Sequence, residues 1–266
     1  MTDVLIIEPK DIVYNANYPT PSGYIYSGVG GANLFTNDPR EIWLGPTNNS
    51  ITYITIDLGS DVLIDTVFLG NVNASVGNIW SFQYGPSALG NVGPYFFYQI
   101  PLRLPSEDGF ASRRGDCIYA AQAPVLARYL QITIQMTAEP NLALEIGRVV
   151  VGAAFRPFYN RETGATRVPF DSGSRERASD GTLNTVSGSL ISGFKWVFGD
   201  LNDAEIKTLW GIFRRRRTTE PLVLIENNGD TITDASVHYG TFVELEGYQR
   251  QDARKNRLAL TFQDWL

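Results

Sequence analysis

The stretch from Ile51 to Asn73 constrains the fold of this chain more than any other. It reads ITYITIDLGSDVLIDTVFLGNVN. Ile54 and Ile56 alternate with polar residues, which is the two-residue period of a β-strand with one buried face. Turn-forming residues interrupt the pattern at 59–61, and a second β-rich run follows from Ile64 to Leu69. The stretch therefore predicts either a hairpin-like pair of strands or two sheets that meet at a corner.

Other runs in the first half also predict strands. The clearest extends from Arg128 to Met136, where apolar and polar residues alternate so that one face is buried. The apolar members of this alternation are Leu130, Ile132, Ile134 and Met136. A short apolar run from Val4 to Ile7 predicts an edge strand. With 25 glycines and 14 prolines available for turns, these runs predict a mainly β chain.

The composition changes after residue 155. Gly, Ser, Thr and Arg dominate from Arg156 to Gly193, and apolar residues become fewer. We place a domain boundary near residues 156–164, because domain junctions fall in polar, Gly-rich segments. The chain is therefore expected to form two domains, 1–155 and 156–266.

One segment of the second half departs from the β pattern. Asn202 with Glu205 three positions later is a capping-box arrangement at the start of a helix. An apolar stripe follows at helical spacing, formed by Ile206, Leu209, Trp210 and Phe213. We predict one helix near residues 203–214 in an otherwise β-rich domain, with this stripe packed against the sheet.

The inventory of reactive residues argues against an enzyme. Cys117 is the only cysteine and His238 the only histidine, and neither lies in a recognisable catalytic motif. We expect His238 to be structural or exposed. No catalytic residue, metal site or cofactor is predicted.

Charge and hydropathy restrict the partners. The formal net charge is −6, whereas nucleic-acid binders usually present a basic field. No apolar run is long enough to span a bilayer, and the start MTDVLIIEPKD does not resemble a secretory signal. We therefore expect no nucleic-acid partner and no membrane insertion.

Aromatic and arginine residues in polar segments are the candidate binding residues. Tyr and Trp rings join a flat apolar face to a polar edge, which suits both sugars and protein partners. The candidates for ligand or partner loops are Tyr24, Tyr26, Phe35, Trp80, Arg113 and Arg114. The alternative is that the rings pack the loops onto the β core.

A run of four arginines ends the predicted helix. We propose Arg214, Arg215, Arg216 and Arg217 as a contact to another subunit, because four adjacent cations in an acidic chain favour an acidic partner surface. The alternative is a solvated helix end, where cations complement the helix dipole.

The first half resembles the discoidin domains, also called coagulation-factor C domains, of the galactose-binding-like family. Three pieces carry the resemblance: ITIDLGSDVLIDTVFLGNVN, ARYLQITI and LEIGRVVVG. The resemblance implies a jelly-roll β-sandwich over residues 1–155, with ligand loops at one end. Those loops would come from Tyr14–Arg40, Asn71–Trp80 and Arg103–Asp116. The paired cysteines of many extracellular members are absent.

The second half resembles small β domains in tail-tip and baseplate proteins of tailed bacteriophages. The pieces are FKWVFGDLNDAEIKTLWGIF, VHYGTFVELEGY and NRLALTFQDWL. The resemblance implies a structural component of a virion tail, made in the host cytoplasm and assembling with itself and with other tail or baseplate proteins. The alternative is a receptor-recognition protein that binds carbohydrate on the host cell surface.

Overall fold

The chain forms two compact units in a computed structural model that describes residues 4–10, 12, 31–45, 51–87, 100–101, 103–104, 115–226, 232–244, 246–252 and 255–265. The N-terminal unit comprises Leu5–Ala154 and Ile225–Val237. The C-terminal unit comprises Met1–Val4, Phe155–Leu224 and His238–Leu266. The described residues are mainly β with one α-helix, which confirms the predicted fold class. The boundaries 1–155 and 156–266 stay predictions about separate folding.

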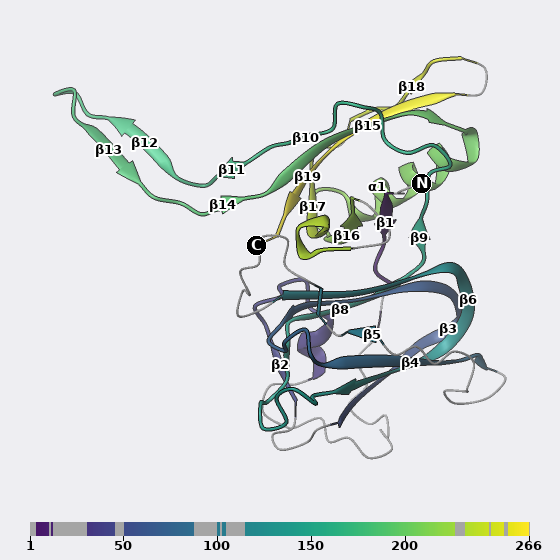
Figure 1. The fold of residues 1–266 in the computed structure, drawn as a ribbon. Helices are drawn as coiled ribbons and strands as arrows, with labels where there is room; N and C mark the ends of the chain where they lie inside the picture. Colours follow the sequence, from purple (N-terminus) through teal and green to yellow (C-terminus); the bar gives the residue numbers. More distant parts are fainter. Residues whose placement is uncertain are drawn as a thin grey trace. The chain divides into compact units, whose positions relative to one another are not determined.

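The N-terminal unit contains one five-stranded sheet and one two-stranded sheet (Figure 1). The strands of these two sheets, with the 3₁₀ helix that precedes them, are η1 (Gly31–Phe35), β2 (Trp43–Leu44), β3 (Ile51–Val72), β4 (Ile79–Gly85), β5 (Ile100–Pro101), β6 (Gly115–Gln135), β7 (Glu145–Ile146) and β8 (Arg148–Gly152). The larger sheet has the order β5-β4-β6-β3-β8, and β2 pairs with β7.

Strands β3 and β6 pair antiparallel from Ile51 opposite Gln135 to Val72 opposite Gly115. The register shifts between Asp57 and Val62. Both strands bend sharply along their length in Figure 1. Within this long pair, β4 contacts only the second half of β6, and β8 contacts only the second half of β3. The long pair therefore passes from one layer to the other within a single bent sheet. The predicted hairpin is wrong, because Ile51–Val72 is one strand, and the predicted corner is a bend inside one sheet, not a junction of two sheets.

One backbone conformation and two local interactions form the corner. Gly59 has a φ of 77°, a left-handed conformation that glycine adopts without strain. The Gly59 amide donates to Oδ1 of Asp57 at 2.8 Å, as in an Asx turn. The guanidinium of Arg128 donates to both oxygens of Asp57, at 2.7 and 2.9 Å. This ion pair joins the two strands where their register shifts.

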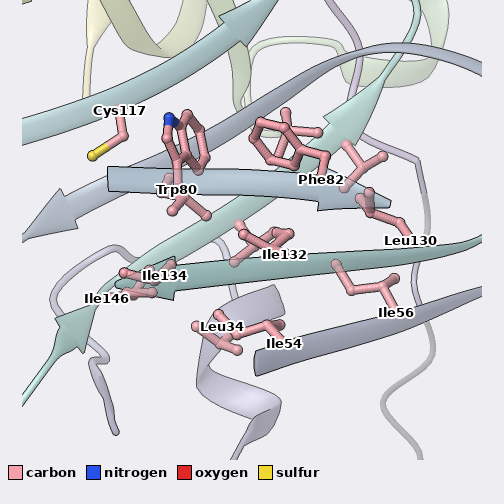
Figure 2. Close-up of a cluster of buried hydrophobic side chains, with 14 of the residues drawn as sticks. Leu34, Ile54, Ile56, Trp80, Phe82, Cys117, Leu130, Ile132, Ile134 and Ile146 are labelled. Carbon is pink, nitrogen blue, oxygen red and sulfur yellow. The ribbon is translucent and has the colours of Figure 1, made fainter. Parts of the chain in front are cut away.

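The core lies between the layers. Side chains from β3, β4 and β6 converge in Figure 2, which shows Trp80 and Phe82 beside Ile132. The predicted apolar face of the Arg128–Met136 strand is buried, with Leu130, Ile132 and Ile134 at 0% exposure and Met136 at 1%. That alternation is therefore confirmed.

An eight-stranded sheet has the order β10-β15-β19-β17-β16-β1-β9, with β18 paired to β19. Its strands are β1 (Leu5–Ile7), β9 (Ala154–Phe155), β10 (Thr166–Arg167), β15 (Gly193–Leu201), β16 (Leu222–Ile225), β17 (Val237–Glu244), β18 (Gln249–Arg250) and β19 (Asn256–Asp264). A second 3₁₀ helix, η3, spans Asp234–Ser236. Two further ribbons are β11 (Phe170–Asp171) with β14 (Leu190–Ile191), and β12 (Ser174–Arg177) with β13 (Leu183–Val186).

The prediction of an edge strand near the N-terminus is wrong. Strand β1 lies between β16 and β9, and its three residues are completely buried. Consecutive apolar residues without alternation are typical of strands covered on both faces, and the run Leu5–Ile7 has that pattern.

The helix α1 (Asp203–Arg216) begins with the predicted capping box. Oδ1 of Asn202 accepts the amide of Glu205 at 2.9 Å, and Oε2 of Glu205 accepts the amide of Asn202 at 2.8 Å. The helix buries Ile206, Leu209, Ile212 and Phe213. The predicted stripe is corrected at one position, because Trp210 is half-buried, contacts Tyr248 edge-on and leaves the buried place to Ile212.

The corner ion pair predicts a pH-dependent stability. The hydrogen bonds from Arg128 hold the pKa of Asp57 below its usual range, so this stabilisation is present above the unfolded-state pKa of about 3.9 and is lost as pH falls through the lower folded-state value. Asp57→Asn should lower the free energy of unfolding by about 1–2 kcal/mol at neutral pH. In urea titrations the difference from wild type should shrink below about pH 4. A difference that stays constant with pH would contradict a role for the charge.

The helix α1 predicts two further stability changes. Leu209 is fully buried, so Leu209→Ala should lower the free energy of unfolding by about 2–5 kcal/mol. Asn202→Ala removes only a cap and should cost about 1 kcal/mol. Urea denaturation monitored by circular dichroism measures both variants. Equal losses would be inconsistent with α1 as a packed helix.

Candidate functional site

Two loops meet at one end of the N-terminal unit. One connects Val72 at the end of β3 to Ile79 at the start of β4, and the other leaves β6 after Gln135. Ile79 is directly opposite Gln135 in the β4–β6 pairing. The loop that leads into β4 and the loop that leaves β6 therefore lie at the same end of this strand pair. We call residues 73–78 and 137–144 the rim.

Glu139 ties the two loops of the rim together. Its Oε2 accepts the backbone amide of Ser75 at 3.2 Å and the Nδ2 of Asn78 at 2.9 Å. Asn78 is completely buried, and its Oδ1 accepts the amide of Ala138 at 3.0 Å. Each polar atom of the Asn78 amide thus has a partner, as burial requires.

A second amide strengthens the rim at its base. The Nδ2 of Asn73 donates to the carbonyl of Ala143 at 2.8 Å, and its Oδ1 accepts the amide of Glu145 at 2.9 Å. The backbone amide of Asn73 also donates to the carbonyl of Glu145, at 3.2 Å. These bonds attach the start of one loop to the end of the other.

The rim presents mixed chemistry to solvent. Val76 is 54% exposed and Leu142 is 38% exposed, and Glu139 is half-buried. Oε1 of Glu139 makes no hydrogen bond to any residue that the structure describes. The rim can therefore offer a carboxyl oxygen as an acceptor, held between two loops that each expose an apolar side chain.

A cluster of buried and half-buried polar side chains lies beside the rim. Arg103 is 7% exposed, and a Cβ at Gly115 would collide with its guanidinium. Oδ1 of Asp116 accepts the amide of Asn71 at 3.0 Å, and Nδ2 of Asn71 donates to the carbonyl of Pro39 at 2.8 Å. Asn71 itself has a φ of 57°. This cluster fastens the chain segments next to the rim.

Cys117 follows this cluster but belongs to the core. Its side chain is completely buried. Burial, and then the neighbouring Asp116 carboxylate, raises the pKa of the thiol well above its ordinary value. The thiolate form that a nucleophile needs is therefore disfavoured.

The structure describes two of the six candidate ligand residues, Phe35 and Trp80. The placement of Trp80 in a ligand loop is wrong, because it lies in β4 with 1% exposure and contacts Phe82 at a centroid distance of 4.6 Å. Phe35 is half-buried and packs against the core, as the alternative predicted for loop aromatics. The remaining candidates lie outside the described residues: Tyr24, Tyr26, Arg113 and Arg114.

The arginine run and the single histidine of the C-terminal unit have different surroundings. Arg214, Arg215 and Arg217 are exposed at the end of α1, and Arg216 is half-buried. His238 is buried, with its Nδ1 3.2 Å from Oδ2 of Asp264 and its ring 4.1 Å from that of Phe194. A structural role for His238 is consistent with this packing.

Sequence patterns did not identify Glu139 as part of a site. Residues 73–78 fall within the loop segments that the discoidin resemblance implied, but residues 137–144 do not. The acidic Glu139 and the buried Asn78 are separated by 61 positions, so only the pairing of β4 with β6 brings them together.

The described residues offer neither a metal site nor a membrane-spanning helix. They contain no cluster of three or more His, Cys, Asp or Glu side chains that could coordinate a metal ion. None of the helices among them has the length and apolar character needed to cross a membrane.

No family model matches this chain, and no curated protein matches it. Several solved carbohydrate-binding modules do match. Chitosan-binding module 1 from a chitosanase/glucanase of Paenibacillus sp. IK-5 is 13% identical, covering 49% of this chain and 89% of the module, with a TM-score of 0.35. The CBM32 module of AlyQ, solved with 4,5-unsaturated mannuronic acid, is 20% identical, covering 54% and 97%, with a TM-score of 0.35.

A third match is CBM32-1 from a family 31 glycoside hydrolase of Clostridium perfringens. It is 13% identical and covers 48% of this chain and 87% of the module, with a TM-score of 0.33. The structural neighbours are thus carbohydrate-binding modules of the discoidin-like type. A tail-tip or baseplate origin receives no support from these matches.

Proposed function

We propose that the N-terminal unit binds carbohydrate at the rim. The observation that carries the proposal is the geometry of Glu139. Two donors from one loop hold its Oε2, while its Oε1 makes no hydrogen bond within the described part of the chain. An ionised carboxylate oxygen is a strong acceptor for a sugar hydroxyl, because O–H···O⁻ hydrogen bonds are charge-assisted.

The surroundings of Glu139 support a sugar ligand over a purely polar one. In one loop, the exposed Val76 directly follows Ser75, whose amide binds Glu139. In the other loop, the amide of the exposed Leu142 donates to the carbonyl of Glu139. Each loop therefore has an exposed apolar side chain near Glu139. Binding sites for small ligands combine apolar contact with a few oriented polar groups. Pyranose rings offer both hydroxyls and C–H faces.

Glu139→Gln tests this proposal. The glutamine can accept the Ser75 and Asn78 hydrogen bonds through its carbonyl oxygen, so its amino group, a donor, then takes the place of the second carboxyl oxygen, an acceptor. The fold should be unchanged, but affinity for a glycan identified on a glycan array should fall about tenfold or more by isothermal titration calorimetry.

Asp61→Asn is the matched control, because Asp61 is an exposed carboxylate in the bend of β3, away from the strand ends that carry the rim. Its affinity should equal that of wild type. Absence of any array signal for the wild type would overturn carbohydrate binding. Equal affinities for wild type and Glu139→Gln would instead show that the glycan binds elsewhere.

Assembly is a second candidate function, favoured by the exposed arginines at the end of α1. Three of the four arginines are exposed in a chain with a net charge of −6. An acidic surface on a second copy or another protein would neutralise them. The proposal is a multi-copy structural role, of which the tail tip was the setting implied by resemblance.

Replacing the four arginines with serine should weaken assembly while leaving the circular dichroism spectrum unchanged. Wild-type assembly should also weaken with added salt, since exposed charges are screened. Sedimentation velocity at low and high salt measures both effects, with Lys207→Ser as a control on the exposed side of the same helix. If the quadruple variant assembles like wild type at low salt, the arginine contact is wrong.

A further inference from the structure

A two-stranded ribbon extends from the eight-stranded sheet of this protein. It consists of residues 170–191, in which β11 pairs with β14 and β12 pairs with β13 (Figure 1). We call these residues the arm. The register of β12 and β13 is regular, from Ser174 opposite Val186 to Arg177 opposite Leu183.

The sequence at the tip explains why the arm forms a ribbon. Ala178 donates to the carbonyl of Thr182 at 2.8 Å around a three-residue loop that ends in Gly181, whose φ is 89°. A left-handed glycine at this place is typical of three-residue hairpin loops. Oδ1 of Asp180 accepts the amide of Thr182 at 2.9 Å, and this bond lowers the pKa of Asp180.

The arm has no core of its own. Every residue of β12 and β13 is exposed, and Leu183, Val186 and Leu190 are 52%, 68% and 73% exposed. Two-stranded ribbons are marginally stable in water without a third strand or a packed face. Such a ribbon gains order when another strand pairs with one of its edges.

The two edges of the arm differ in charge. Strand β12 carries Arg175, Glu176 and Arg177, and charged side chains on an edge oppose the addition of another strand. Strand β13 reads LNTV, and no charged residue or proline occurs between Asp180 and Lys195. The β13 edge therefore lacks the features by which proteins protect exposed strands.

The pairing pattern identifies the backbone groups on the free edges. Ala178 and Thr182 form a hydrogen-bonded pair, and such pairs alternate with non-bonded pairs along an antiparallel ladder. Arg177 with Leu183 and Arg175 with Thr185 are therefore non-bonded pairs. The backbone groups of Leu183 and Thr185 point away from β12, where a further strand can bind them.

We propose that β13 pairs antiparallel with β13 of a second copy of this chain, forming a four-stranded sheet in the order β12-β13-β13-β12. A two-fold axis places odd-numbered residues opposite odd-numbered residues and even-numbered residues opposite even-numbered residues. Along β12 this sets arginine against arginine or Glu176 against itself, which is repulsive. Along β13 it sets Asn184 against itself and Leu183 against Thr185, without repulsion.

Proline substitutions on the two edges test the pairing. Thr185→Pro removes an outward N–H that β12 does not use, so the arm should persist while strand addition is blocked. In sedimentation velocity over a concentration series, wild type should dimerise, and Thr185→Pro should dimerise about tenfold or more weakly. Arg175→Pro, directly opposite in the register, is the matched control and should dimerise like wild type.

A second variant guards against an effect of proline on the arm itself. Thr185→Lys keeps the backbone donor and adds a charge to the bare edge, so it should weaken dimerisation as well. The proposal is overturned if wild type stays monomeric throughout the concentration series. It is also overturned if both Thr185 variants dimerise as tightly as wild type, because another surface would then form the dimer.

Discussion

The antiparallel pairing of β3 with β6 is the constraint on which the N-terminal unit depends. Strands of 22 and 21 residues that pair with each other on both sides of a register shift can enclose one core only if they bend there. Asp57, Gly59 and Arg128 accommodate the bend with a turn on one strand and an ion pair to the other. Because β4 and β8 each extend a different half of the pair, this one bend determines which strands lie in which layer.

The pairing of β4 with β6 brings the two loops of the rim together. The strand ends Ile79 and Gln135 are paired opposite each other. This pairing restricts the conformations of the two loops attached to them. The buried Asn78 then needs partners for both atoms of its amide, and it finds them across the other loop. A site organised in this way loses little entropy on binding, since the order has been established by folding.

Local patterns in the sequence predicted local structure well. The alternation along β6 and the capping box of α1 depend on residues two to four positions apart, and both are present. Predictions that depended on distant neighbours were less successful. Trp80 was assigned to a ligand loop because the discoidin resemblance implied a loop over Asn71–Trp80, whereas Trp80 lies in β4. Trp210 was assigned to the buried stripe, although Ile212 takes that place. The rim required a contact across 61 positions, and periodicity carries no information about such contacts.

The lone cysteine gives the molecule a built-in reporter. Cys117 is sealed inside the N-terminal unit and held in its protonated form, so alkylating reagents should meet a reactive thiol only after β6 has opened. Since the chain has one thiol, the rate of labelling would follow the opening of that unit alone and would be silent on events in α1 or the arm. The native chain thus contains its own chemical probe of local unfolding, and no cysteine has to be introduced.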